Sequence, residues 1–513
     1  MRTLAGRLAE STIATAGLAL TLGLLLGLGV AAGSPLYVGA ALAGGVAAGV
    51  MLTNVRASVL GLLAVLFLLP FAVVPLPIGG VRPTFLDAAL GVLLVAWLSQ
   101  ALLRDGGRFV ATPLNGLVLA FVGLSFVALI AGLSHGLSPE SFRLFLKLVN
   151  SVLLFFGIVN GLRSQEDLIV VTRVLLVLGA SAAIIGIGLY LLPRERAVQA
   201  LSMLGLLGYP TGPGVLRFLA DTDRLRATGT AIDPNVFGAT LALVAGVTFG
   251  QIFGRARVFP LWVLVAILAV TLPALALSLS RAAWLGCAAA AAFVGGLRDR
   301  RIWLALAALP LVLLLGAGDG ADQYFGHLLS GFAARDRAAA MRLDEYREAL
   351  RIISDYPLFG VGFGSAPSVD SFVGVSSVYL QMAEYMGLSG LAVFAAIVVR
   401  FYRDALPLLW PHASTHRPDL GGDGRRTIGE PGANASVSTG PVAVESESIS
   451  PQVDEVRRAI ALSALAAVTA ALVTGLLDHH FFSLRFPHVA ALFWLHVGLA
   501  TAALRRGGSQ VQP

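Results

Sequence analysis

Three arginines lie beside predicted apolar segments, and their chemistry is that of anion binding. Arg226 opens RATGTAIDPNVFG, Arg281 lies in LSLSRAAWLG between two apolar segments, and Arg342 belongs to a long polar segment. A guanidinium group offers five donors in a planar fork that matches phosphate oxygens, and it stays charged at any physiological pH. The pattern predicts a site for an anionic ligand. For Arg281, the competing interpretation is an arginine at a helix end that reaches lipid headgroups at the membrane surface.

Acidic and histidine side chains that could serve as a general base are scattered over several segments. Glu384 lies in VSSVYLQMAEYMGLSG, inside a predicted span, and an ionisable group within a membrane is a functional candidate by default. The competing interpretation pairs Glu384 structurally with an arginine of a neighbouring span, such as Arg173. Asp233 is a second candidate, although an N-cap followed by Pro234 at the first helical position would also explain it. The remaining candidates are Asp370, His327, His479 and His480.

The sequence predicts no cofactor and no metal site. His479 and His480 are adjacent, and neighbouring residues of a helix do not face each other. Cys287 is the only cysteine of the chain and falls in a predicted span, which excludes an internal disulfide and a cysteine-based metal cluster. GVGFGSAP at residues 360–367 lacks the Lys-Ser/Thr of a nucleotide-binding loop, so it is interpreted as a tight loop.

The elements that must position these side chains are transmembrane helices. Of the 513 residues, 57% are hydrophobic and 13% are charged, which is more apolar than a soluble core requires. Many apolar segments approach or exceed the roughly 20 residues that cross a bilayer. We predict an all-α polytopic membrane protein of about 14 transmembrane helices with a large external helical loop. The expected spans are 13–32, 36–54, 58–76, 84–103, 115–133, 143–162, 168–192, 235–254, 258–279, 281–297, 302–317, 376–402, 456–477 and 487–504.

Arginines in alternate short loops set the predicted orientation. Loops rich in Lys and Arg tend to stay in the cytoplasm, so both termini are expected there. The net charge of +7 is explained by these arginines and by those of the outer loops, and no nucleic-acid partner is expected. The arginines assigned to the cytoplasmic side are Arg2, Arg7, Arg56, Arg104, Arg108, Arg163, Arg255, Arg257, Arg298, Arg300, Arg301, Arg403, Arg457, Arg458, Arg505 and Arg506.

Loop lengths and composition divide the chain into five predicted parts. The first span is expected to be a retained helix, because no small-residue cleavage site followed by a soluble domain is found. The Gly-, Ser-, Pro- and acid-rich segment between the last spans cannot bury enough apolar surface to fold. The parts are 1–316 for helices 1–11 with an external loop at 193–233, 317–376 for an external amphipathic helical loop, 377–403 for helix 12, 404–455 for a disordered cytoplasmic linker, and 456–513 for helices 13–14 and the tail.

The long external loop contains one predicted amphipathic helix. In DRAAAMRLDEYREALRIISDYPLFG, apolar residues recur at steps of four and three, which is the period of a helix. Pro357 ends it, because proline disfavours the helical conformation of the preceding residue. We expect the helix to lie over the outer face of the bundle, with Arg342 one turn before Tyr346. The apolar stripe consists of Ala339, Leu343, Tyr346, Leu350 and Ile353.

Four motifs together resemble those of the O-antigen ligase and polymerase superfamily. They are SLSRAAW in a span, R-x-x-x-Y and DYPLFGVGFG in the large loop, and YLQMAEYMGLSGL entering the next span, and the resemblance covers roughly residues 200–400. It implies a GT-C-like integral-membrane glycosyltransferase that uses undecaprenyl-diphosphate-linked sugars on the outer face of the cytoplasmic membrane. By position, Arg226, Arg281 and Arg342 match the outer-face arginines of the family and would bind the diphosphate.

The chain departs from the ligase branch at one position. Ligases show a histidine followed by Asn, Ser or Gln, then nine residues and Gly-x-x-Gly, and Ser376, Ser377, Gly387 and Gly390 fit that spacing. Serine thus stands where the ligase histidine would be, and a hydroxyl cannot act as a general base near neutral pH. Either the base lies elsewhere or none is required, because the leaving diphosphate of an oxocarbenium-like transition state needs charge stabilisation most.

The remaining candidate site residues are assigned by position. The catalytic candidates are Glu384, Ser376 and Asp370. Ser376 and Ser377 could instead simply cap the helix that follows them. Further substrate contacts are expected from Asp233, Asn235, Ser377, Tyr379, His479 and His480.

The resemblance and the arginines favour a metal-independent, inverting glycosyltransferase. The donor is an undecaprenyl-diphosphate-linked glycan and the acceptor a hydroxyl of a saccharide or lipid-linked glycan, in a bacterial cytoplasmic membrane. The missing histidine favours polymerisation or exopolysaccharide assembly over transfer to a lipopolysaccharide core. Further expected partners are membrane lipids and other polysaccharide-assembly proteins. The rivals are a lipid-linked oligosaccharide flippase, which predicts arginines at mid-membrane, and a catalytically inactive relative that binds lipid-linked glycans.

Overall fold

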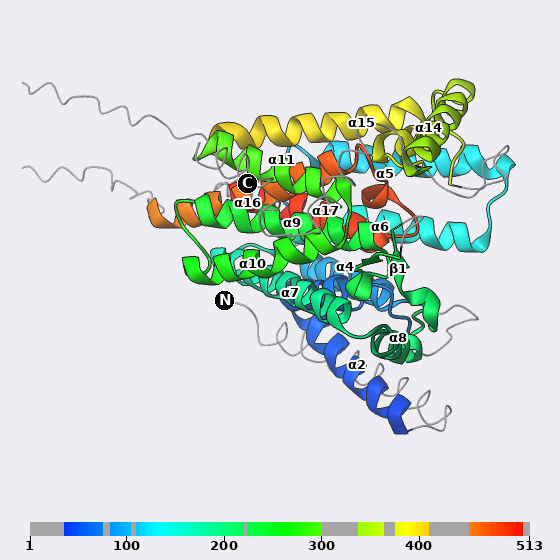
Figure 1. Ribbon diagram of the computed structural model, residues 1–513. Coiled ribbons are helices and arrows are strands. Elements are labelled where there is room, and N and C mark those ends of the chain that lie inside the picture. The colour runs from blue at the N-terminus through cyan, green and yellow to red at the C-terminus, as the bar shows by residue number, and fades with distance from the viewer. Residues whose placement is uncertain are drawn as a thin grey trace, which may run out of the picture.

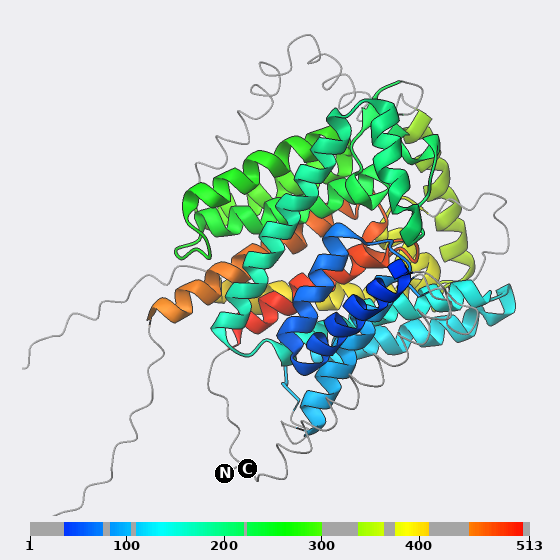
Figure 2. The ribbon, with the colours of Figure 1, turned by 90° about the horizontal axis from the view of Figure 1, so that it is seen from below.

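The computed structural model describes residues 35–74, 83–103, 109–219, 223–299, 337–363, 375–409 and 451–505. These residues form the predicted all-α bundle, with one short antiparallel ribbon of two strands. Long helices run side by side across the molecule (Figure 1). In the view turned by 90°, α17 lies in the middle, between the helices coloured green and those coloured blue (Figure 2).

The first part of the bundle alternates long helices with short connections. A segment of short helices follows its last long helix and leads to the ribbon. The elements are α2 (Pro35–Thr53), α3 (Val55–Leu68), α4 (Phe85–Leu103), α5 (Asn115–Ala131), η1 (Gly132–His135), α6 (Pro139–Gly161), α7 (Gln165–Leu191), α8 (Arg194–Met203), η2 (Leu204–Leu207), η3 (Pro213–Val215), β1 (Arg217–Phe218) and β2 (Leu225–Arg226).

The second part supplies the most buried helices. In Figure 1, α14 lies beside the start of α15 at the same end of the bundle as β1 and α8. The elements are η4 (Gly229–Ala231), α9 (Pro234–Phe253), α10 (Leu261–Leu277), α11 (Arg281–Leu297), α14 (Arg337–Asp355), α15 (Val378–Leu409), α16 (Pro451–Thr474), η6 (His480–Phe482) and α17 (Pro487–Leu504).

Twelve of the fourteen expected spans correspond to described helices. Eight of the described helices are long and apolar enough to cross a membrane: α4, α5 with η1, α6, α7, α9, α15, α16 and α17. Shorter apolar helices are α3, α10, α11 and the Gly44–Thr53 part of α2. The expected spans 13–32 and 302–317 lie outside the described residues.

Small residues bring α9 and α16 into direct backbone contact. A Cβ added at Gly250 would lie 2.4 Å from the Ser463 Cα, and one at Gly246 would lie 3.0 Å from the Ala467 nitrogen. Small residues spaced four apart allow such close approach between membrane helices. This contact fixes the start of α9 relative to the end of α16, and both of these helix ends carry site residues.

The helices α15 and α16 are longer than the sequence predicts. α15 continues to Leu409 and α16 begins at Pro451, so both enter the segment 404–455 that composition assigned to a disordered linker. Arg400 Nε lies 2.7 Å from Asp404 Oδ2, one turn further along α15. The Tyr402 hydroxyl is 2.7 Å from Thr469 Oγ1 of α16. Residues 404–409 and 451–455 are therefore helical in the structure.

Arginines assigned to the cytoplasmic side meet at one end of the bundle. The charge of Arg298 interacts with those of Arg255 and Arg458. Arg505, likewise, lies within electrostatic range of Arg457 and Arg163. Arg281 is the first residue of α11, and Arg298 directly follows the last residue of this helix. Arg281 therefore lies at the opposite end of the bundle from Arg298.

Candidate active site

Arg226 ties three elements together. Its Nε donates to the Ser278 carbonyl oxygen at 2.8 Å, and one Nη donates to the Asn235 Oδ1 at 2.6 Å. The Ala227 N–H donates to the Leu277 carbonyl at 2.9 Å. The ribbon, the first turn of α9 and the turn between α10 and α11 are therefore held in one place.

Two non-glycine residues with left-handed backbone flank this place. Leu279 has φ 53° in the turn that leads to Arg281, and Ile232 has φ 63° directly before Asp233. Such conformations cost on the order of 1–3 kcal/mol each and persist where the surrounding structure over-determines them. They cluster at functional sites more often than elsewhere.

Asp233 is the N-cap that the sequence offered as an alternative. Its Oδ1 accepts hydrogen bonds from the N–H groups of Asn235 and Val236 at 2.8 and 3.1 Å, and Pro234 is the first residue of α9. Asn235 in turn accepts from Arg226. Two of the predicted substrate contacts thus belong to the scaffold that orients Arg226.

The three predicted arginines are brought together electrostatically. Burial lowers the pKa of Arg226 to about 10. The negative charges of Asp233 and Asp478 oppose this shift, whereas the positive charges of Arg281 and Arg342 add to it. Like charges in a low-dielectric setting repel one another, so an anion bound between these arginines would relieve the repulsion.

The face of helix α14 that meets the bundle differs in part from the predicted stripe: Tyr346 meets the bundle, whereas Leu343 and Leu350 do not. Leu343 and Leu350 are 48% and 57% exposed, while Ala349 and Ile352 are buried. The face that meets the bundle also carries the polar residues Arg342, Glu345 and Tyr346. The apolar periodicity was a poor guide because this helix is held by hydrogen bonds as well as by apolar packing.

The chain entering α15 is fixed to α14 through the main chain of Ser376. The Ser376 N–H donates to Glu345 Oε2 at 3.0 Å, and its carbonyl accepts from the Tyr346 hydroxyl at 3.0 Å. Ser377 is buried, and its hydroxyl lies 3.5 Å from the Gly475 carbonyl. These contacts give the serine pair a positioning function between α14, α15 and α16, and a catalytic role of Ser376 stays a prediction.

Tyr379 points away from the arginines toward the apolar interior. Its hydroxyl donates to the Leu472 carbonyl of α16 at 2.8 Å. Its ring lines a small apolar cavity between α5, α15, α16, η6 and α17, together with Phe121, Met382, Phe394 and Trp494. The predicted substrate contact of Tyr379 is untested, and its present partners are helix-packing partners.

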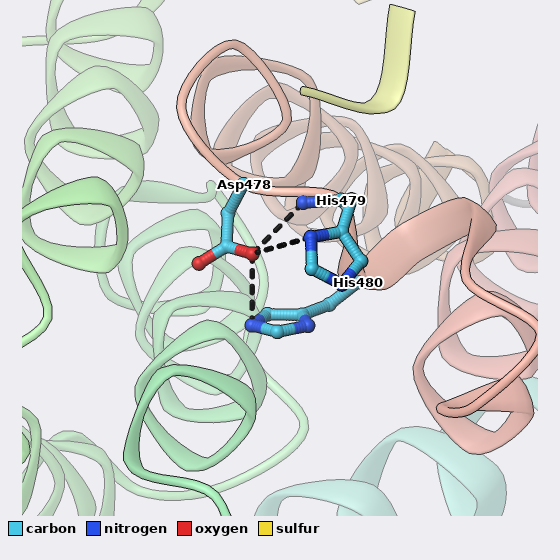
Figure 3. Close-up of side chains that lie close together, drawn as sticks. All are labelled: Asp478, His479 and His480. Atoms are coloured by element: carbon cyan, nitrogen blue, oxygen red, sulfur yellow. Dashed lines mark hydrogen bonds and ion pairs between the residues drawn. The ribbon is translucent and has the colours of Figure 1, made fainter. Parts of the chain in front are cut away.

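Asp478, His479 and His480 form a compact group in the turn after α16 (Figure 3). Asp478 Oδ1 accepts from the His479 N–H at 2.8 Å, and it lies 2.9 Å from His480 Nε2 and 3.6 Å from His479 Nδ1. His480 Nε2 is also 4.0 Å from Asp233 Oδ1 of the α9 cap. This group therefore joins the same end of the bundle as the arginines.

The pKa values of the two histidines shift in opposite directions. Burial raises the pKa of Asp478, but the two histidines and the backbone bond outweigh it and hold the pKa at about 2. Asp478 and Asp233 raise the pKa of His480 against the effect of burial. Burial lowers the pKa of His479 to about 4, with a further contribution from the charge of His480. His479 is therefore neutral at pH 7.

The same three residues are those closest to a metal-binding arrangement among the described residues. Their ligand atoms all lie within 4.8 Å of one another. The 2.9 Å separation of His480 Nε2 and Asp478 Oδ1 is a hydrogen-bond length, and we interpret the group as a carboxylate paired with two histidines. The expected absence of a metal stays a prediction.

Glu384 lies elsewhere on α15, facing another acid. Its carboxylate interacts with the charge of Glu348 of α14, and its carbonyl accepts from the Val361 N–H at 2.9 Å. Arg173, the structural partner that the sequence allowed, instead donates to the Val258 carbonyl at 2.7 Å and lies over the Phe259 ring. A catalytic role of Glu384 stays a prediction.

The α15 helix is interrupted at Gly387, and the glycine-rich loop that follows α14 forms hydrogen bonds with the main chain at this interruption. Gly387 has φ 68° and ψ −175°, which interrupts the helix. The N–H groups of Val361 and Gly362 pair with the last carbonyls before the break, and Leu388 donates to the Pro357 carbonyl. A Cβ at Gly387 would lie 2.2 Å from the Leu358 oxygen. The motif is thus a backbone wedge, consistent with a tight loop, and it binds no nucleotide in this interpretation.

Two candidate bases, Asp370 and His327, lie outside the described residues. Sequence reasoning missed Glu345 and underrated Asp478 as a partner of the histidines. Glu345 could have been found from its position three residues after Arg342, on the same helix face. Asp478 directly precedes the two histidines, but its pairing depends on how the turn after α16 folds.

A polytopic helical membrane protein with clustered arginines at one end of the bundle is the class that fold and site define. Residues 266–395 of the 513 match the family model of the O-antigen ligase, which supports membership in the O-antigen ligase superfamily. The match includes Arg281, Arg342 and Ser376 but not Arg226 or His479. No curated protein matches the chain. The match supports, in general terms, an O-antigen ligase- or polymerase-like membrane glycosyltransferase.

Proposed function

We propose that the protein transfers or polymerises a glycan from an undecaprenyl-diphosphate-linked donor onto a saccharide hydroxyl. The observation that carries the proposal is the grouping of Arg281 and Arg342 around the buried Arg226. Diphosphate is the leaving group of this reaction, and negative charge grows on it as the bond to the sugar breaks. Guanidinium groups preorganised around that charge stabilise the transition state more than the bound substrate.

The site lies on the outer face of the membrane in this proposal. Arg298 and Arg505 lie at the end where several further arginines meet, and the positive-inside tendency assigns that end to the cytoplasm. The diphosphate site at the opposite end then faces the outside of a bacterial cytoplasmic membrane, and both chain termini face the cytoplasm.

The external loop 317–376 covers this site in the proposed arrangement. Its described part, α14, bonds to the main chain of Ser376 through Glu345 and Tyr346. Serine at the position of the ligase histidine favours polymerisation or exopolysaccharide assembly over transfer to a lipopolysaccharide core. The acceptor is accordingly a hydroxyl of a saccharide or of a second lipid-linked glycan.

The position of the arginines supports an enzyme over a flippase. Arg281 is the first residue of α11, and Arg226 precedes the start of α9. A transporter that alternates access would hold its substrate near the middle of the membrane. The other alternative is an inactive relative that only binds lipid-linked glycans. Turnover in the assay below would exclude it.

The test is glycan transfer by the purified full-length protein in lipid nanodiscs. The donors are lipid-linked glycans extracted from membranes of cells that produce the protein, and the assay is run both with and without EDTA because the reaction is proposed to need no metal. We expect transfer by the wild-type protein and a loss of about 10²-fold or more in kcat/KM for Arg342→Ala.

Arg347→Ala is the matched control on the same helix. Arg347 is 73% exposed in its side chain and pairs with Asp344 at 2.9 Å, so its loss should leave transfer within about twofold of wild type. If the wild-type protein moves lipid-linked glycan across the bilayer without forming a new glycosidic bond, the flippase replaces the transferase. Bound donor without turnover would favour the inactive relative.

A further inference from the structure

The serine at position 376 leaves the proposed reaction without its expected base. A hydroxyl group cannot take a proton from another hydroxyl near neutral pH. An acceptor sugar hydroxyl that attacks the anomeric carbon must nevertheless lose its proton. A base at the arginine end of the bundle would supply this step, and the following inference rests on the proposed transferase function.

Most acids and histidines described near the arginines are already committed to other contacts. Asp233 Oδ1 caps α9 through two N–H groups. Glu345 accepts from the Ser376 main chain. The side chains of Asp478 and His480 are only 6% and 4% exposed and face each other at 2.9 Å. Each of these groups holds the scaffold or another side chain.

His479 is the exception in this cluster. Its side chain is 20% exposed, whereas its Nδ1 faces Asp478 Oδ1 at 3.6 Å. The same oxygen accepts from the His479 N–H at 2.8 Å, which fixes the backbone of the residue (Figure 3). At 3.6 Å the contact between Nδ1 and the carboxylate is electrostatic and not a hydrogen bond, and the negative charge of the carboxylate favours the tautomer with the proton on Nδ1. Nε2 then keeps its lone pair.

Charged groups from several elements surround His479 and link it to the diphosphate arginines. Asp478 and His480 lie on its own turn, Arg485 lies a few residues further along the chain, and Asp233 belongs to the α9 cap. Asp478 also acts on Arg226, and Arg342 acts on His480. The histidine and the arginines therefore belong to one electrostatic cluster, in which acceptor and donor would meet.

We propose that His479 is the base that removes the proton of the acceptor hydroxyl, and that Asp478 is its positioning residue. The acceptor oxygen forms a bond to the anomeric carbon as the bond from that carbon to the phosphate oxygen breaks. The electron pair of the broken bond leaves with undecaprenyl diphosphate, whose added charge meets the arginines. The hydroxyl proton goes to His479 Nε2, and the resulting imidazolium is stabilised by the Asp478 carboxylate.

The experiment compares variants of the full-length protein in the same nanodisc assay. His479→Gln should lower kcat by about 10²-fold or more, as expected for the loss of a general base, with donor KM changed by less than about twofold. Asp478→Asn should lower kcat by a smaller factor, because it removes only the positioning carboxylate. Imidazole should restore part of the rate of His479→Ala but none of the rate of Arg342→Ala.

His496→Gln provides the matched control. His496 is buried in α17, with Nδ1 2.6 Å from the Leu492 oxygen, and its replacement should leave kcat close to the wild-type value. Should the His479 variants bind donor poorly through misfolding, imidazole rescue of His479→Ala still decides.

Wild-type rates for His479→Gln would overturn the inference while the transferase function stands. A large loss for Glu384→Gln alone would assign the base to Glu384. Inhibition of the wild type by EDTA, reversed by Zn²⁺, would reassign Asp478, His479 and His480 to a metal site. If the wild-type protein shows no transfer at all, the proposed function fails first.

Discussion

The two ends of the bundle use arginine in different ways. At the end assigned to the cytoplasm, Arg56 is 3.1 Å from both Glu166 and Asp167, at the start of α7. Arg505 donates to the Val159 carbonyl. The arginines at this end thus bond to acceptors of the protein itself. At the opposite end, the Arg226 side chain is held by carbonyl oxygens and the Asn235 amide. Its positive charge is repelled by those of Arg281 and Arg342.

The acids of the two ends differ as well. Glu166 and Asp167 face an arginine directly, whereas Asp233 caps a helix and Asp478 serves two histidines. At the second end, the Asp233 and Asp478 carboxylates act on Arg226 from a distance, while its hydrogen bonds go to carbonyl oxygens and the Asn235 amide. A charge distribution of this kind suits a ligand that brings its own negative charge.

The largest effect on transfer is expected when an arginine of the site end is replaced. Arg281→Ala should lower kcat/KM for glycan transfer by about 10²–10³-fold, the cost of removing one donor from a preorganised anion site. Arg281→Lys should recover part of this loss, because lysine keeps the charge but not the planar fork. The measurement is steady-state transfer at fixed ionic strength.

Arg56→Ala is the counterpart at the other end. It removes a partly exposed ion pair worth about 0–1 kcal/mol and should leave kcat/KM within about twofold of wild type. A loss of transfer as large as that of Arg281→Ala would show that the two ends do not differ as described.

The pH dependence of transfer tests whether His479 is the base at the site end. A base must be unprotonated to act, and burial lowers the pKa of His479 to about 4. The rate should therefore stay level from neutral pH down to about pH 5 and fall about tenfold per pH unit below the pKa. It should fall again above about pH 10, as the buried Arg226 loses its proton.

A profile that already falls near pH 6.5 would contradict this assignment, because it would report a histidine with an ordinary pKa. Circular dichroism at each pH separates loss of catalysis from unfolding.

The broken helix gives a prediction on stability. Gly387→Ala places a Cβ 2.2 Å from the Leu358 oxygen at a φ of 68°, so the wedge formed by the loop must move. We expect a loss of at least about 1–3 kcal/mol, measured as a lower thermal unfolding temperature, together with reduced transfer. Gly91→Ala in α4 meets nothing within 4 Å and should raise stability by about 0.5–1 kcal/mol. Equal unfolding temperatures for the two variants would refute the wedge.

The smallest effect is expected for single tyrosine hydroxyls. Tyr346→Phe removes the bond from α14 to the Ser376 carbonyl, at about 0.5–1.5 kcal/mol, and should lower transfer a few-fold by loosening the cover of the site. Tyr402→Phe removes a comparable contact between α15 and α16 and should leave transfer unchanged. Identical transfer rates of the two proteins would mean that α14 does not position the site.

Helix positions could be predicted from the sequence because hydropathy is a local pattern, whereas the role of the three arginines stays a prediction that rests on the resemblance. Hydropathy predicted the positions of the helices, and Asp233-Pro234 indicated the start of α9. The break at Gly387 could not be predicted, since it depends on a loop that returns from α14 to supply hydrogen bonds.

The packed face of α14 and the pairing of Asp478 escaped prediction for a related reason. Apolar periodicity indicated Tyr346 together with Leu343 and Leu350, but it gave no sign that Glu345 and the Tyr346 hydroxyl bond to the main chain of Ser376. Similarly, adjacent histidines cannot share a helix face, but the turn after α16 is not a regular α-helix and lets both face Asp478.

The most direct test of the central claim is a cryo-electron microscopy structure of the full-length protein in nanodiscs with undecaprenyl diphosphate. The account predicts density for both phosphates between Arg226, Arg281 and Arg342, with His479 beside the adjoining space. Phosphates bound halfway along the helices, or at the end that carries Arg56 and Arg505, would contradict it.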